Sequence, residues 1–187
     1  MSQIRERKQV SKFWQRMIPL LANPTGLAVD RFLMRHFNLS FMGPMFTRAG
    51  GFADRPHLIL RTIHWKTGEL KDVVLPYSKD NENYIVVGSH GGRPTDAIWC
   101  LNIRASSATW ICVARQWYFC EATILQDEER ERCFDIVSDD GGYRNYTKMA
   151  AKYRQLPIVS LNSSLLRSRP QEDPFPGSPI SASAAQQ

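Results

Sequence analysis

Short apolar runs separated by polar turns fill the middle of the chain. Runs rich in β-branched and aromatic residues predict six strands, at residues 57–63, 71–77, 84–88, 109–116, 117–125 and 156–161. Polar turns at 66–68 and 80–83 separate the first three strands. Helical patterns follow at 97–104, about 127–137 and about 142–153. Because these helices are inserted among the strands without alternating with them, the pattern predicts an α+β fold, a closed antiparallel β-barrel with helices.

Before the barrel, the apolar positions change to helical spacing. Phe13, Met17 and Leu20 share one face of a helix predicted over residues 10–22. Asn23 and Pro24 are typical of an N-cap and a first turn, and they predict a second helix. Glycine and proline at 43–44 and glycines at 50–51 predict breaks before the barrel. We therefore expect a helical arm over 1–50, a barrel domain over 51–166 and a disordered tail over 167–187, where Pro, Ser, Ala and Gln dominate.

The positive charge of the chain is confined to the arm. Eight basic and two acidic residues lie within residues 1–50, so this part alone accounts for the net charge of +6. The neutral remainder argues against a nucleic-acid-binding surface. A basic amphipathic arm has two interpretations: it contacts an anionic membrane peripherally, or it covers one mouth of the barrel.

We expect a cytoplasmic protein. Association with a membrane through the arm is the additional expectation. The apolar run at 17–22 is too short for a secretory signal and contains Pro19. No run approaches the length of a membrane span. The four cysteines show no metal-ligand spacing, so we expect reduced, buried thiols and no metal site.

Two turns carry the candidate chemistry. Ser89-His90-Gly91-Gly92 lies between a strand and a helix, where backbone N–H groups can face an anion. Lys66-Thr67-Gly68 combines an ammonium, a hydroxyl and a turn glycine, which also suits an anion. Taken singly, each turn has a purely structural alternative.

Together with Trp99 and Asn102 of the helix predicted over residues 97–104, the two turns resemble the deazaflavin-dependent nitroreductase family over residues 50–162. The resemblance implies a split β-barrel like those of flavin reductases and FMN-binding proteins. It also implies a deazaflavin cofactor, coenzyme F-420, which is a hydride carrier with a phosphate and polyglutamate tail. The implied reaction is hydride transfer to an electron-poor small molecule such as a nitroaromatic, a quinone or an enone. A homodimer is implied at the same level.

The resemblance also assigns site residues. It places Lys66, Thr67 and Gly68 at the cofactor's tail phosphates. It places Ser89, Gly91 and Gly92, through their backbone, and Trp99 against the cofactor, although packing in the core is the alternative for an indole. Tyr143 and Tyr146 would lie near the transferred hydride. They are three residues apart, so they share a helical face, and a phenol can donate a proton to a reduced substrate. The alternative is an aromatic seal of the barrel.

Five positions depart from the family pattern: His64, Trp65, Glu69, His90 and Cys100. Each lost charge-assisted contact to an anionic tail costs roughly 1.5–3 kcal/mol. His64 and His90 replace residues that face the phosphate side, and histidine is suited to proton transfer near neutral pH. The second hypothesis is therefore a cofactor-free isomerase, cyclase or lyase that works through His64, His90, Tyr143 and Tyr146.

Overall fold

A computed structural model of the protein describes residues 9–50, 52–138 and 142–162. The predicted tail at 167–187 and the first eight residues lie outside the described ranges. The helices are α1 (Lys12–Leu21), α2 (Pro24–Phe37), α3 (Met42–Gly50), α4 (Ile98–Ala105), α5 (Asp127–Val137) and α6 (Gly142–Ala150), with a short 3-10 turn, η1 (His90–Gly92). The strands are β1 (His57–Ile63), β2 (Leu70–Pro76), β3 (Ser78–Asp80), β4 (Asn83–Val87), β5 (Ala108–Val113), β6 (Gln116–Ile124) and β7 (Ile158–Asn162).

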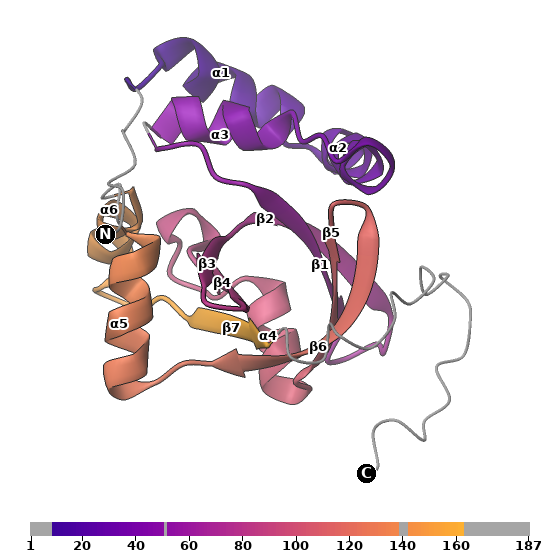
Figure 1. The fold of residues 1–187 in the computed structure, drawn as a ribbon. Helices are drawn as coiled ribbons and strands as arrows, with labels where there is room; N and C mark the ends of the chain where they lie inside the picture. The colour runs from indigo at the N-terminus through magenta and orange to yellow at the C-terminus, as the bar shows by residue number, and fades with distance from the viewer. Residues whose placement is uncertain (1–8, 51, 139–141, 163–187) are drawn as a thin grey trace.

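The strands form one curled antiparallel sheet in the order β2-β1-β5-β6-β7-β4-β3 (Figure 1). Helices α1 to α3 form a layer over one side of the curl, and α5 and α6 lie on another flank (Figure 1). The predicted split-barrel fold is confirmed, and all six predicted strands are present. The seventh, β3, was not predicted because it is three residues long and follows β2 after a single residue.

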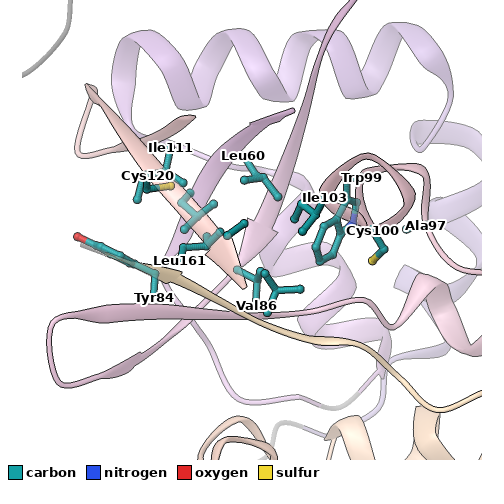
Figure 2. Close-up of a cluster of buried hydrophobic side chains, with 13 residues drawn as sticks. Leu60, Tyr84, Val86, Ala97, Trp99, Cys100, Ile103, Ile111, Cys120 and Leu161 are labelled. Carbon is teal, nitrogen blue, oxygen red and sulfur yellow. The ribbon is translucent and has the colours of Figure 1, made fainter. Parts of the chain in front are cut away.

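Strands β1 and β5 carry buried side chains on both faces of the sheet. On the inner face, Leu60, Val86 and Leu161 meet Trp99 and Ile103 of α4 (Figure 2). Successive side chains of a strand point to opposite faces of the sheet. On the face opposite Leu60, a second cluster packs against Met34 of α2 and consists of Ile59, Trp110, Cys112 and Trp117. A third cluster joins β4 and β7 to α5 and α6. The arm is therefore part of the packed structure, with α2 covering the outer face of the sheet.

The second helix begins as the sequence predicts. The Asn23 side chain accepts a hydrogen bond from the backbone N–H of Gly26 at 2.9 Å, and Pro24 occupies the first helical position. The break predicted at 43–44 is wrong, because residues 42–50 form α3. All four cysteines are free and buried, as predicted. Within the described ranges, no helix combines the length and apolar character needed to cross a membrane.

Candidate active site

A cavity of about 420 Å³ lies between the N-terminal helices and the barrel. It is bounded by α2, α3, the segment 52–57, β2, the turn at 89–91 and α6. Its volume falls in the range of small-molecule sites, roughly 300–1,000 Å³. The apolar part of its wall consists of Leu27, Met42, Phe46, Phe52, Ala53, Val73, Val74 and Pro76.

Four of the residues predicted from the sequence line this cavity: Ser89, Gly91, Tyr143 and Tyr146. The two tyrosine rings lie 6.4 Å apart between centroids, and the Tyr146 ring lies 5.4 Å from that of Phe52. Burial raises the pKa of the Tyr146 phenol, so this group stays protonated across the neutral range. The turn after β4 and the tyrosine pair of α6 thus meet at one cavity, while their chemical roles stay predictions.

The turn after β4 is held by Arg154, which sequence reasoning missed. Its guanidinium donates to the backbone carbonyls of Gly88 at 3.1 Å, Ser89 at 2.9 Å and Arg93 at 3.0 Å. It also forms an ion pair of 2.7 Å with Asp96. A guanidinium presents five donors in a fixed plane, which suits this set of partners. No local motif marks Arg154, because its partners lie about sixty residues earlier in the chain.

Two glycines of this turn have left-handed backbones. Gly91 has φ +63° and open space where a Cβ would stand, whereas Gly92 has φ +75° and a Cβ there would lie 3.0 Å from Met149 Cβ of α6. Gly92 therefore permits close packing of α6 on the turn, and Gly91 leaves bare backbone exposed toward the cavity.

The β1–β2 hairpin is stabilised by its own side chains. His64 Nδ1 accepts hydrogen bonds from the backbone N–H groups of Lys66 and Thr67, both at 3.3 Å. The Thr67 hydroxyl contacts Glu69 at 3.2 Å, and a hydrogen bond from Lys71 lowers the pKa of Glu69. Lys66, Thr67 and Gly68 do not line the cavity.

His90 and Trp99 also lie outside the cavity wall. His90 Nδ1 lies 2.8 Å from the Thr95 carbonyl, and the Trp99 side chain, only 7% exposed, belongs to the barrel core. Each predicted imidazole is thus bonded within its own turn, while Asp96 pairs with Arg104 and Arg154. The catalytic assignment of His64 and His90 stays a prediction.

The cavity instead contains an imidazole that sequence reasoning did not select, His57. Beside it, Asp30 is 2% exposed and accepts hydrogen bonds from the Ser40 hydroxyl at 3.1 Å and from the N–H groups of Phe41 at 2.9 Å and Met42 at 3.1 Å. This carboxylate caps α3 from α2. Burial lowers the pKa of His57, and the nearby Asp30 acts in the opposite direction. A capping carboxylate twelve residues before its helix leaves no local sequence signal.

The comparisons with known proteins agree with the resemblance seen in the motifs. Residues 34–163 match the F420H2-dependent quinone reductase family. An F420H2-dependent quinone reductase of Mycobacterium tuberculosis is 29% identical over 108 residues, which are 57% of this chain and 72% of the relative.

Two solved structures share the fold. The structure of an F420H2-dependent reductase superimposes with a TM-score of 0.52 at 24% identity, over 58% of this chain and 95% of that one. A protein described as a domain-swapped dimer gives a TM-score of 0.50 at 22% identity, over 75% of this chain and all (100%) of that one. With the family match extending over most of the barrel and part of the arm, this chain belongs to the F420H2-dependent quinone reductase family and is a deazaflavin-dependent oxidoreductase.

Proposed function

We propose that this reductase transfers a hydride from reduced deazaflavin to a flat, apolar acceptor of the quinone type, with enones and nitroaromatics as further substrates. The observation that carries the proposal is the convergence of Ser89, Gly91, Tyr143 and Tyr146 on one largely apolar cavity. The name of the mycobacterial relative supports quinones as the first class to test.

The residues at the cavity fit a deazaflavin. The open space at Gly91 gives a ring system direct access to backbone, and the apolar wall suits a flat aromatic group. Ser89 and Gly91, which line the cavity, would hold the ring, while Lys66 and Thr67, outside its wall, would supply cation and hydroxyl to the phosphate of a tail that extends beyond it. When bound, the reduced cofactor supplies the hydride.

The chain itself positions the acceptor and supplies hydrogen bonds. The protonated Tyr146 phenol can donate to an acceptor oxygen, which gains negative charge during reduction. Tyr143 lies beside it on the same face of α6, and both tyrosines line the cavity with Phe52. The apolar wall excludes water, so the rate enhancement would come mainly from positioning two reactants in a dry site.

The first test is a fluorescence titration of the full chain with oxidised deazaflavin, with FMN as the control ligand. We expect saturable deazaflavin binding in the micromolar range or tighter, followed by oxidation of the reduced cofactor when a naphthoquinone is added anaerobically. Absence of deazaflavin binding would overturn the proposal.

Replacing Lys66 with alanine tests the assignment of the tail phosphate. We expect deazaflavin affinity to fall roughly tenfold, because one charge-assisted contact is lost at an exposed site. The Lys152→Ala variant removes another exposed lysine of the chain and should bind like the wild type. Unchanged affinity in the Lys66 variant, with an unchanged melting temperature, would remove Lys66 from the site.

We also propose that the arm contacts an anionic membrane. Nine of the thirteen exposed large hydrophobic side chains of the described residues lie on the arm: Val10, Phe13, Leu20, Leu27, Val29, Phe32, Phe37, Leu39 and Phe46. They stand among five basic residues, and the single acidic residue of 9–50 is the buried Asp30. Leu27 and Phe46 also line the cavity, so the apolar surface is continuous with the site and offers a path for an acceptor dissolved in lipid.

Replacing Phe32 and Phe37 with serine tests this contact. We expect the full chain to sediment with vesicles of phosphatidylcholine and phosphatidylglycerol, and the double variant to bind at least about tenfold more weakly, because two apolar groups no longer insert. Substitutions suit this test better than deletion of the arm, since Met34 of α2 is part of the core. The Ile98→Ser variant, altered at an exposed site on α4, is the control. Equal sedimentation of all three proteins would contradict the proposal.

The homodimer stays a prediction, which sedimentation velocity would test.

A further inference from the structure

The imidazole of His57 is built into the wall of the cavity at the junction of the arm and the barrel. His57 is the first residue of β1, and its ring lies against Gly43 in the first turn of α3. A Cβ at residue 43 would lie 2.4 Å from Cε1 and 2.5 Å from Nε2 of that ring. The position of the ring therefore depends on a glycine at 43, although the same residue was expected to be only a chain break.

The ring also has a defined electrostatic setting. The backbone of Arg55 and the carboxylates of Asp30 and Asp54 favour the charged form of the ring. Burial outweighs them, so the pKa of His57 lies below its ordinary value of 6.5 and the ring is neutral at neutral pH. The charged and titratable groups around it are Asp30 and Arg31 of α2, Asp54 and Arg55 before β1, Asp72 of β2, and Tyr143 and Tyr146 of α6.

Most of these neighbours are already engaged. Asp72 pairs with Arg61 at 2.6 Å, Asp30 caps α3, and Arg55 donates to the Val137 carbonyl at 2.7 Å. His57 lines the cavity, so a ligand there can meet a nitrogen of its ring. A neutral imidazole accepts a hydrogen bond at that nitrogen, and an imidazolium donates one.

We propose that His57 is the polar anchor for the oxygen atom of the bound acceptor, and that its protonation state decides which form of that oxygen the cavity prefers. The neutral ring accepts from a hydroxyl, as in a hydroquinone product, and the charged ring donates to a carbonyl, as in a quinone. The inference rests on the proposed function for the identity of the acceptor. Its test uses binding alone and needs neither cofactor nor turnover.

Two probes of nearly the same size, used without cofactor or oxidant, separate the two forms: alpha-naphthol carries a hydroxyl and alpha-tetralone a carbonyl. NMR of the His57 ring protons gives its pKa, and the affinities of both probes for the full chain are measured by calorimetry at about pH 7.5 and at about one pH unit below that pKa. We expect naphthol to bind at least about threefold more weakly at the lower pH and tetralone at least about threefold more tightly. By linkage, naphthol should lower the pKa of His57, followed by NMR of its ring protons, and tetralone should raise it.

The His57→Gln variant should lose both pH dependences, and His36→Gln, altered at an exposed histidine of α2, should keep them. The Gly43→Ala variant keeps His57 but displaces its ring, so the pH dependence of both probe affinities should weaken. A separate unfolding experiment checks that this variant is folded. Affinities that do not change with pH, or a pH dependence retained in His57→Gln, would overturn the proposal. If either outcome occurs while deazaflavin still binds normally, the His57 proposal is rejected and the proposed function still stands. Probe binding with the expected pattern but no deazaflavin binding would reject the proposed function alone.

Discussion

Replacing Arg154 with lysine is expected to lower the free energy of unfolding by about 3 kcal/mol and to weaken deazaflavin binding as well. An ammonium can keep the ion pair with Asp96 but cannot also reach the carbonyls of Gly88, Ser89 and Arg93 from one position. The Gly88 and Ser89 carbonyls, whose hydrogen bonds to Arg154 are half-buried, account for most of the cost when they lose their donor. Urea unfolding monitored by tryptophan fluorescence measures the first effect, and the deazaflavin titration measures the second.

The control for this prediction is Arg144→Lys. Arg144 pairs with Asp135 at 2.8 Å, but both side chains are more than half exposed, so we expect a change within about 0.5 kcal/mol. A stability of Arg154→Lys equal to that of the wild type would show that the guanidinium does not hold the turn. Lost stability with unchanged deazaflavin affinity would show that the cofactor does not use the turn.

The sequence predicted those parts of the fold that depend on local pattern. The run at 57–63 is bounded by charged or polar turns and becomes β1 with the same limits, and Asn23 caps α2 through its own side chain. Helix α3 was missed because Gly43, Pro44 and Gly50 are typical of breaks. It forms because a carboxylate from another helix satisfies its first N–H groups, and no pattern within residues 42–50 contains that information.

The site was predicted to the extent that it consists of motifs. The Ser89–Gly92 turn and the tyrosine pair were selected from residue type and spacing; both tyrosines line the cavity, and so do Ser89 and Gly91 of the turn. His64 and His90 were selected on the same grounds, but their partners are the neighbouring residues of their own turns. His57 and Arg154 could not be selected, since their importance comes from packing between segments distant in the chain.

Replacing Asp30 with alanine is expected to have the largest effect on stability, a loss of about 4 kcal/mol. The change leaves the N–H groups of Phe41 and Met42 without an acceptor in a buried place and removes a negative charge from the N-terminus of α3. At roughly 2–4 °C per kcal/mol for a chain of this size, the melting temperature should fall by about 8–16 °C. Amide hydrogen exchange should increase first in α3.

The Asp30→Asn variant separates hydrogen bonding from charge at the same position. Asparagine caps helices about as well as aspartate, so we expect a loss of only about 1 kcal/mol, mostly from the missing charge. Because Asp30 favours the protonated form of His57, the neutral amide should lower the pKa of His57 further. Alpha-naphthol would then keep its full affinity to a lower pH than in the wild type, while alpha-tetralone would need stronger acid to gain affinity. If Asp30→Asn instead left the pKa of His57 unchanged while α3 stayed folded, the buried carboxylate would serve only as a helix cap, and the acceptor site would be electrostatically independent of the arm.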